Sequence, residues 1–483
     1  MSQTTAPPSS AVLRPTGPRS MLASMIAVEL ASGVTQQYLS PLLAGLGERA
    51  GITTAQQNWI YVIQTTSMAV FTPVLSRLGD SHGYRRVLRL SVAAVALGSL
   101  LMALWPDLPV LTLGAVLQGG VVGFMPLMIG ILRNRGGEKA SRTGIGILVS
   151  ALLLAVGFAG ILSGEVGAHD AGDGLWVGVA AGLLGCAACV LMPDGDPRPA
   201  RGHHFDLMGF LLLTLALSGV VLALSQGGAW GWTSAPTLVC ALVGVAALVV
   251  WPLMELRRER PLVDVRMFRN PRVAVLSTVT FFVSFATIGS LAANSTFLAA
   301  SPGKAGYGMG LSSAAIGWVL LPMTAASVVS SLLTPALLRR AGERITVGAA
   351  GATTLAGFGG LVLWHGTLAD YLVLSSFAGL AMGLFESATR ALMVEAVPEE
   401  QTATAAGINE LVLSLGVAVG AAAIGAGLSA HSGTDGRVAV GGYTTGWALC
   451  AIAGLAAAVV AVRLRGAAPA GAAGEAGAAV PAP

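Results

Sequence analysis

The sequence predicts an all-α polytopic membrane protein, and three observations lead to that prediction. Of the 483 residues, 54% are hydrophobic and only 10% are charged, whereas soluble domains carry about 25% charged residues. The mean hydropathy is +0.75. Apolar runs of the length that crosses a bilayer as a helix, about 20 residues, occur fourteen times. A fold in water could not cover this much apolar surface with so few polar side chains.

The fourteen apolar runs define the predicted transmembrane helices, and their even number places both termini on one side of the membrane. In chain order the predicted spans are 21–44, 58–77, 87–105, 109–132, 143–164, 175–192, 207–226, 236–254, 272–299, 314–337, 346–365, 370–394, 402–428 and 444–463.

The distribution of positive charge predicts the orientation of these spans. With the N-terminus in the cytoplasm, all but four of the 27 Lys and Arg residues lie in inward-facing segments or at their edges. The exceptions are Arg49, Lys304 and Arg437 in outer loops, and Arg390 inside a span. Such an excess on one side follows the positive-inside rule. We therefore expect a multi-pass protein of the plasma (inner) membrane with both termini in the cytoplasm.

The loop between the second and third spans reads SRLGDSHGYRRVL, residues 76–88. It resembles GxLxDxxGxRR, the signature of the major facilitator superfamily; the matching residues are Leu78, Asp80, Gly83, Arg85 and Arg86, with Ser76 in place of the first Gly. Gly83 allows a tight turn, and the arginines can meet carboxylates or phospholipid head groups. The alternative is a generic charged turn that only fixes topology.

The resemblance of this loop to the superfamily signature also suggests a conformational gate formed by Asp80, Gly83, Arg85 and Arg86. A carboxylate is stabilised by the free amides at a helix N-terminus. We expect Asp80 to dock near the start of the thirteenth span, around Gln401–Thr404, and so to close the cytoplasmic side.

Internal repetition agrees with this resemblance. The segment ALLRRAGERITV, residues 336–347, repeats the loop, with Gly342 over Gly83, Arg344 over Arg85 and Arg339 in place of Asp80. A GxxxG pattern, which lets helices approach closely, occurs at 119–123 and again at 379–383. Transporters of this superfamily are built from such repeated halves.

The resemblance therefore implies two pseudo-symmetric six-helix bundles plus an inserted two-helix hairpin, 14 transmembrane helices in all. The predicted parts are a disordered cytoplasmic N-terminus (1–19), an N-terminal bundle (20–192), a linker (193–271) with a transmembrane hairpin (207–254), a C-terminal bundle (272–464) and a disordered cytoplasmic tail (465–483). The hairpin is expected to pack outside the central path.

The sequence segments in and around the predicted hairpin point to one branch of the superfamily. FDLMGFLLL, GGAWGWTS and ELRRERPLVDVRMFRNPR resemble the corresponding segments of the fourteen-helix drug:proton antiporters. The resemblance implies a monomeric secondary transporter that exports lipophilic drugs or antibiotics in exchange for protons, with a small amphipathic substrate, protons and membrane lipids as partners and no nucleic acid. A facilitator or symporter that imports a small nutrient is the alternative.

The chain differs from that branch at the residues that usually couple transport to protons. The first span has Glu29 where an Asp pattern is usual, and Ala115 stands where an Arg is usual in the fourth span. Carboxylates within spans are only Glu29, Glu386 and Glu410. An ionised group at the bilayer centre costs at least about 2.5 kcal/mol, so such residues are paired, hydrated or functional.

These acids are the candidates for proton coupling, together with Arg390. Glu386 and Arg390 are four residues apart on one predicted helix and can form an ion pair. Glu29 and Glu410 are expected to be unpaired, which disfavours their charged form and suits binding and release of a proton. Glu29 ranks first because Gln36, Gln37 and Tyr38 follow it on the same helix. The alternative is that these charges only neutralise one another for packing.

The substrate path is expected at the midplane between the halves, where transporters of this type bind their substrates. Amide, Met and aromatic side chains are expected to line it, because Met and aromatic side chains adapt to large amphipathic molecules. The candidate residues are Gln36, Gln37, Tyr38, Gln64, Gln118, Met125, Asn294, Met323, Phe385 and Asn409.

Other chemistries have little support in the sequence. No nucleotide-binding P-loop is visible, so we expect neither ATP use nor an enzyme, and no cofactor or metal. Cys186 and Cys189 form a CxxC inside an apolar helix and are interpreted as packing residues rather than a redox or metal pair. His203 and His204, with Asp206, are interpreted as a solvated loop rather than a metal site.

Overall fold

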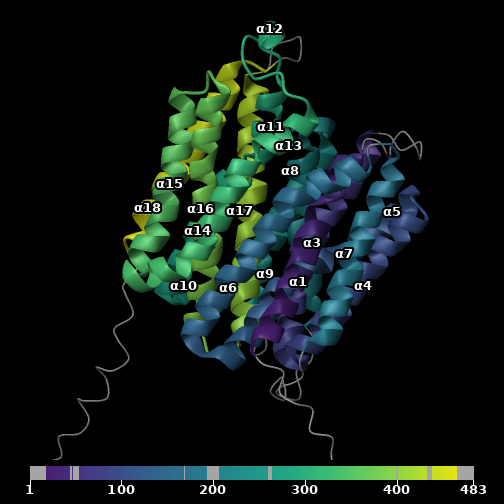
Figure 1. Cartoon of the computed structure of the whole chain (residues 1–483), viewed down its shortest axis with the longest axis vertical. Helices are drawn as coiled ribbons and strands as arrows, with labels where there is room; N and C mark the ends of the chain where they lie inside the picture. The colour runs from purple at the N-terminus through teal and green to yellow at the C-terminus, as the bar shows by residue number, and fades with distance from the viewer. Residues whose placement is uncertain are drawn as a thin grey trace, which may run out of the picture.

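The computed structural model describes residues 18–43, 46, 54–167, 169–192, 206–258, 261, 264–398, 401–431 and 438–464. Its regular structure is helical (Figure 1). The helices are α1 (Pro18–Gln37), η1 (Ser40–Leu42), α3 (Thr54–His82), α4 (Tyr84–Leu104), α5 (Leu108–Gln118), η2 (Gly119–Gly123), α6 (Phe124–Val166), α7 (Ala171–Leu191), α8 (Leu207–Trp230), α9 (Ala235–Glu255), η3 (Val265–Arg269), α10 (Pro271–Thr287), α11 (Leu291–Ala299), α12 (Pro302–Ala305), α13 (Ser313–Val319), α14 (Leu321–Arg340), α15 (Glu343–Leu363), α16 (Leu368–Glu395), α17 (Thr402–Ala430) and α18 (Val440–Ala461).

Eleven helical segments among the described residues are long and apolar enough to cross a membrane, and a further apolar helix, Met208–Ala223, is shorter. The helices α1 and α3 occupy the first two predicted spans. The prediction of an all-α polytopic membrane protein is therefore confirmed, while the number fourteen stays a prediction.

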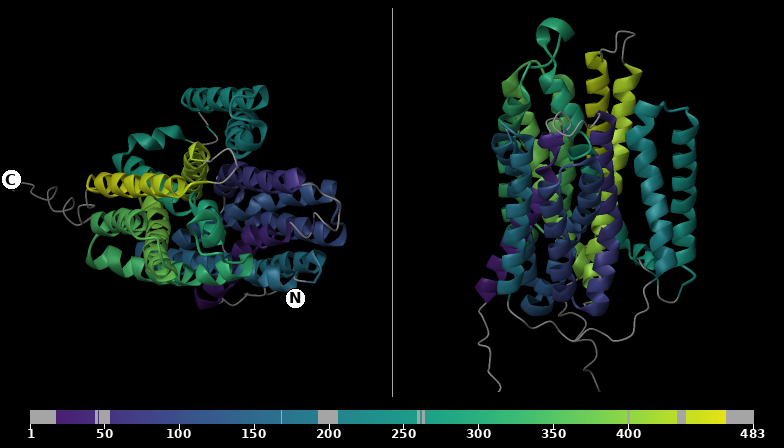
Figure 2. Two further views of the ribbon diagram at one scale, coloured as in Figure 1. Left: turned by 90° about the horizontal axis from the view of Figure 1, so that it is seen from above. Right: turned by 90° about the vertical axis from the view of Figure 1, so that its right-hand side faces the viewer.

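The helices form two groups that lie side by side. Helix α1 packs on α6 and α7 in the first group, and α15 packs on α16 and α18 in the second. Figure 2, seen from above, places the purple and blue helices on one side and the green and yellow helices on the other. The groups meet where α3 packs against α17 and where α6 packs against α14, α16 and α17. We call these groups the N-terminal and C-terminal halves.

The hairpin of α8 and α9 lies at the edge of this arrangement, as the right-hand view in Figure 2 shows. Helix α8 buries Leu213 and Leu217 against the halves and contacts α3 and α17. Helix α9 packs mainly on α8 and exposes Leu242 and Val249. Within the described residues the hairpin therefore packs outside the two halves, and its position relative to a substrate path stays a prediction.

The repeated loop has the same backbone turn in both halves. Gly83 precedes α4 with φ of 96°, and Gly342 precedes α15 with φ of 82°. Residues that carry a side chain rarely adopt a positive φ of this size, whereas glycine adopts it without strain. Gly83 and Gly342, which are aligned in the sequence repeat, therefore also occupy equivalent positions in the structure.

The GxxxG segments pack closely but differently in the two halves. A Cβ atom on Gly383 would lie 1.9 Å from the carbonyl oxygen of Ser327, so α16 and α14 touch through their backbones. In the first half, residues 119–123 instead form the 3-10 helix η2, where a Cβ on Gly123 would meet Leu75 at 2.6 Å.

Two predicted boundaries differ from the structure. The fourth and fifth predicted spans are joined by one continuous helix, α6, of 43 residues. The joining segment contains no proline that would end a helix. The ninth predicted span is instead divided into α10 and α11, and a Cβ on Gly289 in the intervening turn would lie 3.1 Å from the backbone of Gly420.

Candidate functional site

Three ionisable side chains meet between α16 and α17. Arg390 donates from Nη1 to Glu386 Oε2 at 2.7 Å, one turn earlier on the same helix. It also binds Glu410 through two parallel hydrogen bonds, from Nε to Oε1 at 2.7 Å and from Nη2 to Oε2 at 3.1 Å. All three side chains are buried, with at most 5% of any of them exposed. We call these residues the Arg390 cluster.

This geometry confirms one expectation and corrects another. The ion pair of Glu386 and Arg390 forms as the four-residue spacing predicts. The expectation that Glu410 is unpaired was wrong, because α17 lies against α16 and presents Glu410 to the same guanidinium. Glu410 is therefore a structural partner of Arg390, and Glu29 is left as the acid without an ion pair.

Glu29 approaches the Arg390 cluster from the other half. Its side chain on α1 is fully buried, and neither carboxylate oxygen forms a hydrogen bond or an ion pair with the described residues. The Ser32 hydroxyl lies beside it and accepts a hydrogen bond from Gln36 at 3.1 Å. The charges of Arg390, Glu410 and Glu386 all act on Glu29. The Arg390 guanidinium therefore binds two carboxylates of the C-terminal half, and a third carboxylate, from the N-terminal half, lies within range of its charge without contacting it.

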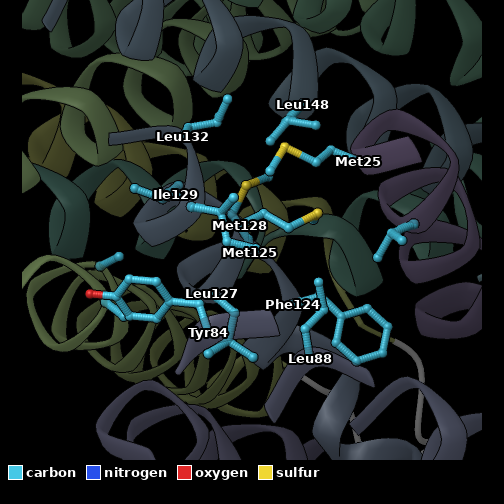
Figure 3. Close-up of a cluster of buried hydrophobic side chains, with 14 of the residues drawn as sticks. Met25, Tyr84, Leu88, Phe124, Met125, Leu127, Met128, Ile129, Leu132 and Leu148 are labelled. Carbon is cyan, nitrogen blue, oxygen red and sulfur yellow. The ribbon is translucent and has the colours of Figure 1, made fainter. Parts of the chain in front are cut away.

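The helices that carry these groups pack through a shared apolar cluster. Met25 and Val28 on α1 belong to the same buried cluster as Ala391 on α16 and Ala403 on α17. Figure 3 shows the neighbouring part of that cluster, in which the thioethers of Met25, Met125 and Met128 gather at its centre. Little polar surface is available there to solvate an ion, so the attraction between opposite charges is strong.

Polar residues continue the site on the C-terminal side. Asn409 precedes Glu410 and is fully buried, and its Oδ1 accepts a hydrogen bond from Thr280 on α10 at 2.9 Å. Its Nδ2 has no hydrogen-bond acceptor within the described part of the chain. Asn409 therefore has an unused donor next to the Arg390 cluster. Thr280 was not identified from the sequence, where an isolated Thr in an apolar helix gives no signal.

Three of the predicted substrate residues form a network in the N-terminal half. Gln118 Oε1 accepts a hydrogen bond from Gln64 Nε2 at 2.8 Å, and Gln118 Nε2 donates to the Tyr38 hydroxyl at 2.7 Å. Gln118 Nε2 also donates to Ser99 Oγ at 2.9 Å, a residue that the sequence analysis did not select. All four side chains are almost completely buried. In this conformation these amides satisfy one another rather than face an open cavity.

The other predicted substrate residues are distributed over both halves. Gln36 and Gln37 are half-buried on α1. Met125, Met323 and Phe385 are buried in apolar packing. Asn294 accepts a hydrogen bond from the Trp447 indole at 2.9 Å and thereby belongs to the interior of the C-terminal half. The structure thus does not bring the ten candidates together, and their role in substrate binding stays a prediction.

The Asp80 side chain joins the two halves at the end of the bundle where α3 ends and α4 begins, which we call the basic end. It accepts hydrogen bonds from the amide of Thr404 at 2.9 Å and of Ala403 at 3.3 Å, and from the Thr404 hydroxyl. The Tyr84 hydroxyl also donates to Asp80, at 2.8 Å. The predicted docking of Asp80 on the first turn of α17 is confirmed.

The arginines of the same loop have different surroundings. Arg85 is 7% exposed, so it faces the protein interior, whereas Arg86 is exposed. Arg89, one turn later, donates from Nε to the carbonyl oxygen of Cys189 at the end of α7, at 3.1 Å. The three arginines therefore point in different directions, and only Asp80 among the predicted gate residues crosses to the other half through a described hydrogen bond.

A second connection between the halves at the basic end was not predicted. Arg142 of α6 binds both oxygens of Glu395 of α16, at 2.6 and 2.8 Å. Arg272 reaches Glu343 at 2.7 Å and Glu395 at 3.4 Å, so four charges form one network. Arg133 of α6 adds a hydrogen bond to the carbonyl oxygen of Val397 at 2.8 Å. The basic end is therefore closed in this conformation.

The cysteines and histidines noted in the sequence add no site of their own to the described residues. Cys186 and Cys189 are free thiols on α7, and Cys189 is buried in the N-terminal core. No group of three or more His, Cys, Asp or Glu side chains within the described ranges is arranged to hold a metal ion. His203 and His204 lie outside the described residues.

Two helical halves pack across a buried charge cluster and are joined by hydrogen bonds and ion pairs at the basic end, the arrangement of a polytopic membrane protein. The model of the Major Facilitator Superfamily matches residues 25–367 and 275–482. The chain belongs to the Major Facilitator Superfamily, so it is a secondary transporter and not an enzyme.

Several known proteins are similar to this chain in sequence. The multidrug resistance protein Stp of Mycobacterium tuberculosis is 29% identical over 385 residues, which cover 77% of this chain and 69% of the relative. The probable actinorhodin transporter of Streptomyces coelicolor is 26% identical over 426 residues, 82% of this chain and 70% of the relative. The tetracenomycin C resistance and export protein of Streptomyces glaucescens is 25% identical over 394 residues, with coverages of 78% and 70%. These relatives confirm the resemblance to drug and antibiotic exporters.

Solved structures show the same fold. The human organic anion transporter TETRAN superposes with a TM-score of 0.64 at 16% identity and covers 92% of this chain and 100% of the transporter. The nucleoside transporter NupG gives a TM-score of 0.53 at 13% identity, with coverages of 92% and 98%. At these identities the similarity is one of fold alone.

Proposed function

We propose that this protein exports lipophilic drugs or antibiotics across the plasma membrane in exchange for protons, by alternating access of its two halves. The observation that carries the proposal is Glu29, a buried acid of the N-terminal half that forms no ion pair with the described residues and is influenced by the charges of the Arg390 cluster in the C-terminal half. The three relatives named above, which are called resistance or export proteins or a transporter, support the direction of transport.

A proton on Glu29 would change the force between the halves. With Glu29 ionised, a third negative charge lies near the single guanidinium that already binds Glu386 and Glu410; with Glu29 neutral, that third charge is absent. The force between α1 and the Arg390 cluster therefore differs between the two states, because an ionised Glu29 is attracted by Arg390 and repelled by Glu386 and Glu410, and such interactions are strong where water is excluded. A ligand shifts a conformational equilibrium only by the difference in its affinity for the two conformations. In this proposal the ligand is the proton, and its affinity for Glu29 differs between the conformations.

The substrate would bind between the halves, near the groups with unused hydrogen-bonding capacity. Asn409 has a free Nδ2 donor beside Glu410, and Gln36 and Gln37 lie on α1 beyond Glu29. The network of Tyr38, Gln64 and Gln118 would have to open, since its members are hydrogen-bonded to one another in this conformation. The ten predicted substrate residues belong to this proposal.

The function is tested with purified protein in liposomes under an imposed pH gradient. Structurally diverse lipophilic cations, zwitterions and neutral antibiotics are offered, and we expect accumulation of at least one class only when the gradient is present. Uptake of a polar nutrient without any gradient-driven drug transport would favour the facilitator or symporter alternative.

The proposal includes fourteen spans, both termini in the cytoplasm, and the segment boundaries given by the sequence: 1–19, 20–192, 193–271 with the hairpin 207–254, 272–464 and 465–483. An epitope tag inserted after Trp232, between α8 and α9, is expected to be reached by antibody from outside intact cells. A tag after Leu262 is expected to be reached only after the membrane is permeabilised. The reverse pattern of labelling would show that the orientation is wrong.

Asp80 is proposed to hold the basic end closed. Hydrogen bonds to a charged group contribute about 1.5–3 kcal/mol each, so Asp80→Asn is expected to slow export about tenfold while the protein still inserts. Asp107→Asn is the matched control, because Asp107 caps its own helix α5 through Val110 and does not join the halves.

A crosslink reports whether this contact opens. Cysteines are placed at Ser81 and Gln401, next to the Asp80 contact, in a variant without the four native cysteines. We expect crosslinking to fall when substrate and a pH gradient drive the cycle. If the yield is the same in every condition, the loop is only a topology anchor.

A further inference from the structure

A cavity of about 450 Å³ lies between α3 and α4 at the basic end, outside the charged site. Its walls are almost entirely apolar and include Phe71 and Leu75 of α3, Leu90 and Ala94 of α4, and Leu117 of α5. Leu90 is 65% exposed, so the cavity opens on the outer surface of the bundle. This volume is within the range of about 300–1,000 Å³ typical of small-molecule sites.

The cavity is lined by two parallel stripes of residues that each end in a basic side chain. Residues four apart share one face of a helix, and on α4 that face carries Arg86, Leu90 and Ala94. On α3 the corresponding face runs from Leu75 to His82 at the end of the helix. The apolar cavity is thus bordered by an imidazole and a guanidinium at the basic end, where a membrane surface would lie.

The charges around this rim are unbalanced. Asp80, the only acid in residues 76–88, is turned to the start of α17. Arg89 donates to the carbonyl oxygen of Cys189 on the side of α7. Arg86 is exposed and has no ion pair or hydrogen-bond acceptor within the described part of the chain. Within the described residues, the Arg86 guanidinium at the rim of the cavity therefore has no carboxylate partner.

We propose that this cavity is a binding site for one anionic phospholipid of the inner leaflet. An acyl chain would fill the apolar groove, and the phosphate would bind Arg86 with His82 beside it. An anionic lipid fits better than a zwitterionic one, because the residues described at the rim include no acid to bind a choline or ethanolamine group. Basic residues near a membrane surface attract anionic lipids. The inference does not depend on which compound is transported.

The floor of the cavity supports an apolar occupant. Ser91 lines it but donates its hydroxyl to the carbonyl oxygen of Gly120 at 3.2 Å. A Cβ atom on Gly120 would lie 2.7 Å from this hydroxyl, so the contact is tight. The polar floor groups are thereby satisfied by each other, and an acyl chain would leave none of them without a partner.

The test is native mass spectrometry of the full-length protein in detergent, titrated with dioleoyl phosphatidylglycerol or dioleoyl phosphatidylcholine. We expect the first phosphatidylglycerol to bind about fivefold more tightly than phosphatidylcholine, the effect of about one basic residue. Arg86→Gln is expected to remove this preference. Ala94→Phe, which fills the groove, is expected to weaken binding of both lipids at this site.

Two matched variants serve as controls. Arg340→Gln changes an exposed arginine at the equivalent turn of the other half, and Ala93→Phe adds the same bulk at an exposed position of α4 that does not line the cavity. Both should bind like the parent. If Ala94→Phe does not yield monodisperse protein, Ala94→Leu is used for the same comparison.

Equal affinity of the parent for the two lipids would overturn the proposal, as would unchanged lipid binding in the folded Ala94 variant. If that variant binds phosphatidylglycerol normally but loses drug transport, the groove is a passage for substrate and not a lipid site. Lipid binding is measured without transport, so the result can be interpreted even if the export proposal is wrong.

Discussion

Glu29→Gln is expected to reduce pH-gradient-driven export in liposomes to the rate seen without a gradient. Glutamine keeps the size and polarity of the side chain but cannot release a proton, so the charge on α1 no longer changes during the cycle. Exchange of labelled for unlabelled substrate across the membrane should persist, because it needs the two conformations but no net proton movement. Radiolabelled substrate fluxes with and without the gradient measure both.

Glu165→Gln is the control for this experiment. Glu165 is an acid of the same half, but it is exposed near the end of α6, so its neutralisation should leave the gradient-driven rate unchanged. Parent-level coupled export by Glu29→Gln would show that Glu29 is not the coupling acid. If Glu410→Gln also kept the parent rate, a facilitator mechanism would be the better interpretation.

Arg390→Ala is expected to prevent stable folding. The change leaves Glu386 and Glu410 buried beside each other without the guanidinium that binds both. Breaking a buried pair by removing one partner costs about 3–5 kcal/mol, a large part of a typical stability of about 5–15 kcal/mol. Fluorescence-detected gel filtration and thermal unfolding in detergent should show low yield and a lower Tm. Arg340→Ala, on the exposed end of α14, should behave like the parent.

A combined variant distinguishes loss of charge balance from loss of packing. Replacing a whole buried ion pair or triad with uncharged residues of similar volume is often neutral or stabilising. The triple variant Glu386→Gln, Arg390→Met and Glu410→Gln should therefore recover the yield and Tm that Arg390→Ala loses, but not coupled export. If Arg390→Ala melts like the parent, the cluster does not support the fold. Poor folding of the triple variant would assign the defect to packing around Arg390.

Features confined to one helix or one loop could be predicted from the sequence. Hydrophobic composition and the length of the apolar runs identified the class of protein, because a helix must cross a fixed thickness of lipid. The four-residue spacing of Glu386 and Arg390 predicted their ion pair, since residues one turn apart face the same way. One contact between helices, that of Asp80 with the start of α17, could also be predicted, because the 76–88 loop resembles a known signature.

The other pairings between helices required the tertiary structure. Glu410 binds Arg390 although twenty residues separate them, and Gln118 joins Tyr38, the residue after α1, to side chains of α3 and α4. Such contacts depend on the rotation and depth of each helix against its neighbours, which the period of one helix does not contain. The sequence by itself determined that a few acids lie in the membrane; the packing of α16 on α17 decided that Glu410 is paired, and the position of α1 decided that Glu29 is not.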